Sequence, residues 1–226
     1  MSKKVENPQD VVVAEAVSKT EAFFEKNGKQ VIVALVALVV LVAGGYAFKT
    51  LVVDRNKTLA EELIVEAQER FAGETPDYAL ALNGDEAGAG FLDVVEQYGS
   101  TPSGNLAKHY AGICYLHLGD LEQANEYLAK YKAVKGLAGA VVNAQNYGLR
   151  GDIAVEQGNY EEAVKLYKKA VAAADNDYTA PLYLYKQGLA LVALGKDADA
   201  KACFETITTK YQSSMESREA ERMLGL

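Results

Sequence analysis

The two histidines are the residues best suited by type to metal binding or acid–base chemistry, and their spacing argues against a shared role. His109 and His117 lie eight residues apart in a segment that is predicted to be helical. Eight residues correspond to about two turns and a rotation of about 80°, so the two rings cannot bind one metal ion. The sequence contains no HExxH or CxxC motif and no recognisable Ser, His and Asp arrangement. We therefore predict no enzyme activity, no catalytic residue, no metal site and no cofactor.

A glycine-rich run, Gly84–Gly90, has the composition of a phosphate-binding loop but not its chemistry. It lacks the Gly-Lys-Ser/Thr ending, and Asp85 and Glu86 place two carboxylates where phosphates would lie. It also lacks the alternating carboxylates and terminal Glu of a calcium loop. The run is predicted to be a turn.

Three segments share one pattern of residues, and this pattern indicates how the predicted helices pack. A small residue in one helix is followed by a Gly-polar turn and then by an alanine early in the next helix. The segments are Gly112–Ala124, Gly151–Ala163 and Gly188–Ala200, spaced by 39 and then 37 residues. Such a pattern lets two antiparallel helices pack closely and stack on the next pair.

The pattern resembles the tetratricopeptide repeat, whose usual length is about 34 residues. Tyr167, Ala170 and Phe204 continue the family pattern in the later units. The resemblance implies an array of helical hairpins that binds proteins. Cys114 and Cys203 would lie on non-adjacent units, so we expect buried, inert thiols; a reactive or bridging thiol is the alternative.

The predicted fold is all-α, with one transmembrane helix followed by an α-solenoid of about four helical hairpins and a C-terminal capping helix. In the first unit an enlarged connection, Gly73–Gly90, is predicted to separate the two helices. The expected helices are Thr58–Phe71, Phe91–Tyr98, Leu106–Leu118, Leu121–Lys132, Gly139–Gln157, Tyr160–Ala174, Ala180–Leu194, Asp197–Tyr211 and Ser213–Leu224.

The segment Val31–Phe48 contains no charged residue. Eighteen helical residues span about 27 Å, close to the hydrocarbon thickness of a bilayer, so a transmembrane helix is the favoured interpretation. A cleaved signal peptide, with Ala43-x-Gly45 or Gly45-x-Ala47 as its cleavage site, and a buried core helix are the alternatives. The expected domains are a tail at 1–29, the span at 30–52 and the repeat domain at 53–226.

The tail is predicted to form a helix over Asp10–Lys26, which Asn27 and Gly28 would end. Such a helix is either an amphipathic helix that docks on a membrane partner or lies at the membrane interface, or a juxtamembrane helix that continues the span.

The charge distribution excludes one class of partner. The net charge is −8, and residues 50–226 hold 26 acidic against 17 basic side chains. An acidic body repels phosphate backbones, so nucleic acid is not expected, and no small-molecule substrate is indicated. Lysines and arginines near the span are evenly divided, while Lys3 and Lys4 favour a cytoplasmic N-terminus.

Six stretches carry a second resemblance: Tyr78–Gly84, Gly90–Asp93, Tyr98–Gly99, Gly104–Ala107, Tyr110–Gly112 and Thr179–Tyr183. The resemblance covers nearly the whole chain and is to bacterial membrane-anchored tetratricopeptide proteins of Bacteroidetes type. In layout the chain is similar to YfgM-like proteins, which accompany the Sec translocon and contact periplasmic chaperones. The resemblance implies an inner-membrane protein with a periplasmic repeat domain that serves as an adaptor in protein export or envelope assembly. A holdase that binds unfolded clients is the alternative.

The resemblance also implies a ligand groove. In this family the fifth and thirteenth residues of the first helix of each unit usually face the concave side of the array. The alternative interpretation is that these residues form ordinary solvated helix surface. A clamp for a terminal carboxylate is not expected, because His109, Ile113 and Leu149 stand at the clamp places. The residues predicted to face the groove are His109, His117, Gln145, Asp152, Glu156, Tyr185 and Val192.

Overall fold

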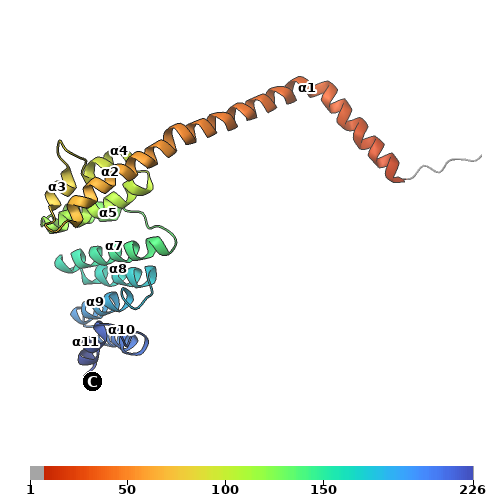
Figure 1. Cartoon of the computed structure of the whole chain (residues 1–226). Helices are drawn as coiled ribbons and strands as arrows, with labels where there is room; N and C mark the ends of the chain where they lie inside the picture. The colour runs from red at the N-terminus through yellow and green to blue at the C-terminus, as the bar shows by residue number, and fades with distance from the viewer. Residues whose placement is uncertain (1–7, 226) are drawn as a thin grey trace, which may run out of the picture. The chain divides into compact units, whose positions relative to one another are not determined.

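The computed structural model describes residues 8–225 and divides the chain between Asn56 and Lys57 into two compact units. The first unit contains a long helix, α1 (Pro8–Phe48), followed by a π-helical stretch, η1 (Lys49–Asp54) (Figure 1). The second unit contains the helical array and begins within helix α2, which covers Arg55–Ala72.

Helix α1 runs through the predicted stop at Asn27 and Gly28, so that prediction was wrong. The Asn27 side chain donates to the carbonyl of Phe23, four residues earlier in the same helix, at 3.2 Å. One glycine costs a helix only about 1 kcal/mol, and strong helix formers flank it. Residues 1–7, and the side chains of Val13 and Val17 on the expected apolar face, lie outside the described residues.

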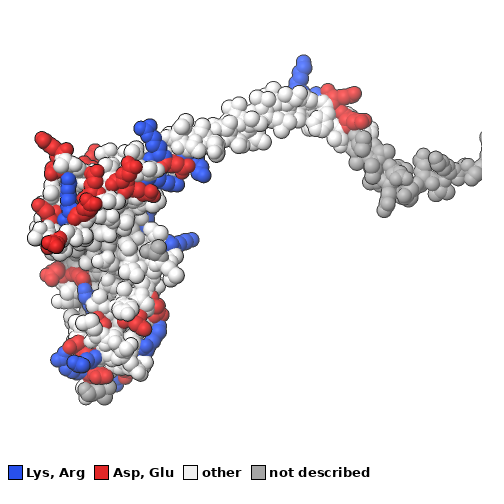
Figure 2. Space-filling view, in the orientation of Figure 1, with Lys and Arg blue, Asp and Glu red and all other residues white. Residues whose placement is uncertain are grey.

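The charge-free part of α1 has its side chains exposed along its length and forms a white cylinder in Figure 2. The helical stretch Thr20–Ala72 contains an 18-residue window with a mean hydropathy of 2.7, none of it buried within the molecule. A stretch of this length and composition is long and apolar enough to cross a membrane. Because the window is not buried, the structure does not support a core helix.

The second unit is an α-solenoid of four helical hairpins with a closing helix, which confirms the predicted fold class (Figure 1). In the first hairpin, Ile64 and Ala67 of α2 belong to one core cluster with buried residues of α3, α4 and α5. The closing helix α11 packs on α9 and α10 through Ala220 and Leu224. The remaining bounds are α3 Tyr78–Asn83, α4 Phe91–Tyr98, α5 Pro102–His117, α6 Leu121–Lys130, α7 Leu137–Glu156, α8 Tyr160–Ala173, α9 Ala180–Ala193, α10 Asp197–Lys210 and α11 Glu216–Leu224.

The repeat glycines lie at the point where the two helices of each hairpin are closest. A methyl group at any of these glycines would lie 2.5 to 2.6 Å from a side chain sixteen residues later, too close for an ordinary contact. The second helix can therefore approach only because the first has no side chain there. The pairs are Gly112 with Leu128, Gly151 with Tyr167, and Gly188 with Phe204.

Two details of the first half differ from the prediction. Helix α3 lies inside the segment that was predicted to be a connection, with the Asp77 carboxylate accepting from the Leu80 amide at its start. Helix α5 begins at Pro102 instead of Leu106. Thr101 caps it through the Gly104 amide, and proline suits the first turn because its missing N–H has no partner there.

The glycine-rich run is a turn, as predicted, and α2 holds it in place. The Arg70 guanidinium donates to the Gly88 carbonyl at 3.0 Å and pairs with Asp85 at 2.8 Å. The Glu66 carboxylate accepts from the Ala89 amide at 2.9 Å.

Candidate functional site

An ion pair joins the third and fourth hairpins. Lys186 Nζ, on α9, lies 2.8 and 2.7 Å from the two carboxylate oxygens of Asp152 on α7. The hydroxyl of Tyr167, on α8, donates to the same carboxylate at 2.7 Å. Burial, followed by the bond to Asp152, raises the pKa of Tyr167 well above its ordinary value, so its proton is firmly held.

An open hollow of about 240 Å³ lies beside this ion pair. Leu189 contributes a side chain that is 40% exposed, and Tyr160 and Val155 add apolar surface. A hollow with apolar walls and a polar pair at its side can accept an apolar side chain and orient a neighbouring polar group. Its lining residues are Asp152, Val155, Tyr160, Tyr167, Lys186, Leu189 and Ala190.

His109 was predicted to lie on the groove surface, but its side chain is only 1% exposed. Its Nε2 lies 3.2 Å from the Gln145 side-chain oxygen, and its Nδ1 lies 3.3 Å from the Asn146 amide nitrogen, which also donates to the Leu128 carbonyl. These partners fit a neutral ring with its proton on Nε2. Burial lowers the pKa of His109 to about 4, although the bond to Gln145 acts in the opposite direction. His109 therefore joins α5 to α7 instead of offering its ring to a ligand.

The other predicted groove residues are spread along the array. His117 is exposed and stacks on the Tyr78 ring at 3.8 Å between centroids. The partly buried Tyr185 ring lies 5.8 Å from Phe204, and Glu156 is exposed on the last turn of α7. Val192 lines a second hollow, of about 300 Å³, formed with α10 and α11.

Of the seven predicted residues, all of them described, only His109 and Gln145 are hydrogen-bonded to each other. Asp152 is the member that lines the hollow beside the ion pair. Sequence reasoning missed Lys186 and Leu189. One signal was available, because Lys186 follows Asp152 by 34 residues, about one repeat length.

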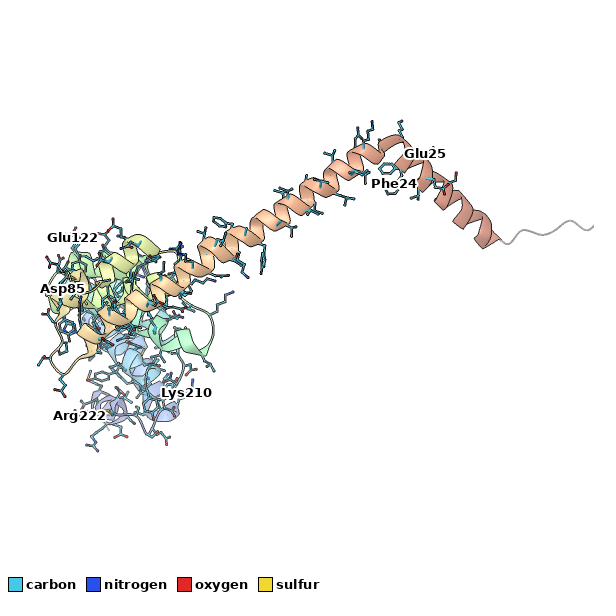
Figure 3. All side chains as sticks on the ribbon, turned by 45° about the horizontal axis from the view of Figure 1, so that its top comes forward. Phe24, Glu25, Asp85, Glu122, Lys210 and Arg222 are labelled. Carbon is cyan, nitrogen blue, oxygen red and sulfur yellow. The ribbon has the colours of Figure 1, made fainter. Side chains whose placement is uncertain are left out.

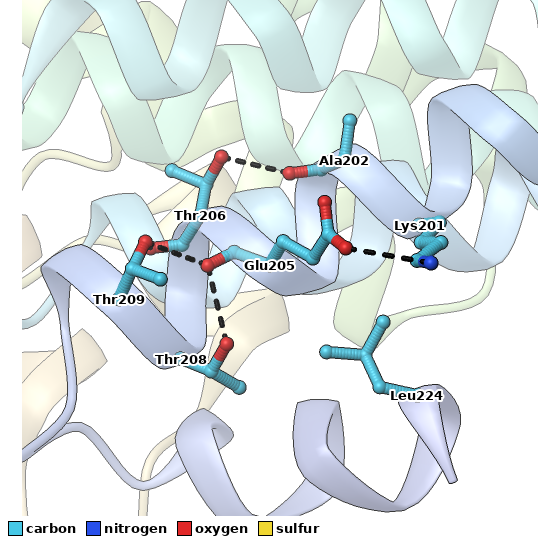
Figure 4. Close-up of a pocket in the computed structure, with 7 residues that line it drawn as sticks. All are labelled: Lys201, Ala202, Glu205, Thr206, Thr208, Thr209 and Leu224. Carbon is cyan, nitrogen blue, oxygen red and sulfur yellow. Dashed lines mark hydrogen bonds and ion pairs between the residues drawn. The ribbon is translucent and has the colours of Figure 1, made fainter. Parts of the chain in front are cut away.

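A further hollow, of about 690 Å³, is an open surface between α10 and α11 (Figure 4). The threonine hydroxyls in it donate to carbonyls of their own helix, with Thr206 bound to Ala202 and Thr209 to Glu205. Lys201 pairs loosely with Glu205 at 3.6 Å. These polar groups are therefore engaged with partners on α10 itself.

Both thiols are buried and unpaired, as predicted. Burial raises the pKa of Cys114 to about 12 and raises that of Cys203 as well, which disfavours the reactive thiolate. Within the part of the chain that the structure describes, no three His, Cys, Asp or Glu side chains gather closely enough to hold a metal ion.

Comparison with protein families supports the repeat assignment. One tetratricopeptide-repeat model matches residues 141–178 and 149–214, and a second matches residues 107–133. The matched residues are therefore similar to tetratricopeptide repeats. The matches cover most of α5, all of α6, most of α7 and all of α8 to α10, which include the ion pair and its hollow. Tetratricopeptide repeats act as protein–protein interaction modules.

Two solved structures are similar to parts of the chain. The crystal structure of MamA is 19% identical, with 59% of this chain and 84% of that chain covered and a TM-score of 0.41. A crystal structure of a Podosopora anserina putative kinesin light chain with nearly identical TPR-like repeats is 16% identical, with 76% of this chain and 86% of that chain covered and a TM-score of 0.48. No curated protein matched the sequence.

Proposed function

We propose that this protein is a membrane-tethered protein-binding module whose tetratricopeptide repeats bind a segment of a partner in the hollow beside Asp152 and Lys186. The observation that supports it most is the joining of three helices from two repeats around one open, partly apolar hollow. A single side chain in that hollow would contact both repeats at once.

The chemistry of the hollow favours a short motif in the partner. An apolar side chain of the partner would contact Leu189 and Tyr160, and removing both surfaces from water would drive the contact. Lys186 and Asp152 would orient a polar group beside that side chain. A hollow of about 240 Å³ suits one anchor residue of a defined motif more than it suits long apolar stretches of an unfolded chain.

The membrane tether is the second part of the proposal. The apolar segment Val31–Phe48 would span the inner membrane with a cytoplasmic N-terminus and a periplasmic repeat domain. A tether confines the domain near membrane partners and raises its effective concentration there. This arrangement suits an adaptor or accessory subunit of protein export or envelope assembly, with an integral membrane partner such as a translocon or a periplasmic chaperone.

The adaptor role is tested by exchanging Val31–Phe48 for an unrelated span in the full chain. Co-purification from mild detergent should lose the membrane partner and leave the helical content unchanged. A matched chain with the native span and Leu189→Asp should lose the partner that docks in the hollow, whereas Lys168→Asp on exposed α8 should not. If the span exchange is harmless and the purified protein suppresses aggregation of an unfolded client in a manner that depends on Leu189, the protein is a holdase instead.

A further inference from the structure

The three most exposed large apolar side chains among the described residues occur at successive connections between repeats. Leu137, Tyr178 and Met215 are 94%, 88% and 92% exposed. Leu137 follows the α6–α7 connection, Tyr178 lies in the α8–α9 connection, and Met215 ends the α10–α11 connection. Isolated exposed apolar residues are common, but one nearly bare side chain per repeat at the equivalent place is a pattern.

These connections lie at the same edge of the second unit. In an array of antiparallel hairpins the connections alternate between two edges. The turns within hairpins form the hairpin-turn edge, at residues 118–120, 157–159 and 194–196; the connections between hairpins form the repeat-joining edge, at residues 131–136, 174–179 and 211–215. Figure 1 shows the connections after α6, α8 and α10 on one side, and Figure 3 shows Lys210 on that side and Glu122 on the opposite side.

The start of α2 also lies at the repeat-joining edge of the second unit. At the C-terminal end of α2 the ring of Phe71 contacts Tyr78, and Tyr78 stacks on His117 at the C-terminal end of α5. Helices α2 and α5 therefore end at the hairpin-turn edge. Lys57, near the start of α2, lies at the other edge, and the residues before it lead directly from the apolar segment of α1.

The α6–α7 connection differs in charge from the hairpin-turn edge. The hairpin-turn edge carries exposed acidic residues in the first turns of α6, α8 and α10, including Glu122, Glu161 and Asp197. The α6–α7 connection instead carries exposed Lys132 and Lys135 between apolar residues.

Further lysines lie close to the α6–α7 connection. One acidic residue of the repeat-joining edge forms an ion pair. Burial, followed by the charges of Lys132 and Lys130, lowers the pKa of Lys108. In the α8–α9 connection the Asp175 carboxylate is paired with Lys210 at 2.7 Å, while Asp177 adds one negative charge there. Glu216 adds another beside Met215 at the α10–α11 connection.

We propose that the repeat-joining edge is a lipid-contacting edge, at which Leu137, Tyr178 and Met215 enter the interfacial layer of a bilayer and Lys132 and Lys135 contact anionic headgroups. Apolar side chains flanked by lysines bind this layer because the apolar parts leave water while the ammonium groups remain with the headgroups. The proposal rests on the proposed tether. A tether would keep this edge near the bilayer, so that lipid contact would not require association from free solution.

The test uses the full chain reconstituted into phosphatidylcholine vesicles, with and without phosphatidylglycerol. Single cysteines are introduced as Leu137→Cys, Tyr178→Cys and Met215→Cys, labelled with an environment-sensitive fluorophore and challenged with a nitroxide lipid quencher. Leu118→Cys, at the hairpin-turn edge and 48% exposed, is the matched control. Leu38→Cys reports the span itself, and the unsubstituted chain reports labelling of the two buried thiols.

We expect nitroxide quenching at residues 137, 178 and 215 to exceed that at residue 118 by at least about twofold, as interfacial burial requires. Quenching at residue 137 should be weaker in vesicles without phosphatidylglycerol. It should also be weaker in the Lys132→Ala, Lys135→Ala double variant. Quenching at residue 38 alone would overturn the lipid-contacting edge and leave the tether intact. Quenching at the three edge positions without residue 38 would support the edge and overturn the tether. A fluorophore shift without quenching would mean that protein covers the edge, which also overturns the proposal.

Discussion

Gly151 and Tyr167 fix the register of the central hairpin. A Cβ at Gly151 would lie 2.6 Å from Tyr167 Cε1, so the aromatic ring of α8 occupies the space that a side chain on α7 would need. The same ring donates its hydroxyl to Asp152, the next residue along α7. Close packing of the hairpin and the polar arrangement beside the hollow thus depend on the same aromatic residue.

Overpacking this hairpin should destabilise it. Ala163 is fully buried on α8, in the same core cluster as Tyr167. Ala163→Leu is expected to lower the free energy of unfolding by about 1–3 kcal/mol, because three added carbon atoms must displace packed neighbours. Ala202→Leu, at an exposed position of α10, is the matched control and should change it by less than about 0.5 kcal/mol. Denaturant unfolding of the full chain in detergent measures both; equal stability of the two variants would show that the assigned register is wrong.

Stability should depend on pH through His109. Its folded-state pKa of about 4 is below the ordinary value of 6.5, so the unfolded chain binds the proton more tightly. The stabilisation is therefore complete above about pH 6.5 and is lost as pH falls toward 4. The loss should be about 3 kcal/mol, by linkage at 1.36 kcal/mol per pKa unit.

The pH dependence is measured by denaturant unfolding between pH 4 and 7. His109→Gln removes the titrating ring, so its stability should change less over this range even if it is lower throughout. A wild-type profile with the same slope as this variant would mean that other groups cause the dependence.

The ion pair beside the hollow should show coupling. Asp152→Asn is expected to cost about 1–2 kcal/mol, because the Lys186 ammonium and the Tyr167 hydroxyl lose their shared carboxylate. The pair is about one-third exposed, so screening by water keeps the effect modest. In a double-mutant cycle with Lys186→Met, the coupling energy should be near 0.5–1 kcal/mol. Strict additivity of the two changes would show that the contact contributes nothing to stability.

Membrane orientation is tested by protease accessibility. If the N-terminus is cytoplasmic, protease added to intact spheroplasts should digest the repeat domain at residues 57–226. Protection in intact spheroplasts, followed by digestion after lysis, would reverse the proposed orientation.

The sequence predicted the helical hairpins well because their signals are local. Gly119 and Gly158 adopt positive φ at the turns, and Asp120 and Asn159 cap the helices that follow, so each boundary is determined by adjacent residues. Helix α3 was missed because it is only six residues long, and glycines of the same segment dominated the pattern.

The candidate site was less predictable because it depends on contacts between repeats. The position of a residue within its repeat placed Asp152 and His109 on the first helix of a unit, but it did not predict how deeply each side chain is buried. His109 is buried because Gln145 and Asn146, 36 and 37 residues later, satisfy its two nitrogens. Lys186 was missed for the same reason, since its partner lies in the preceding repeat.

Site-specific photo-crosslinking tests the central claim most directly. A photo-reactive amino acid is placed at residue 189 in the hollow, or at exposed residue 168 on α8, in the full chain expressed in its native membrane. The proposed function predicts a discrete crosslinked partner at residue 189 that is absent at residue 168 and is lost on Asp152→Ala. The same crosslinked products at both positions, or none at residue 189 while the chain is folded and membrane-bound, would contradict it.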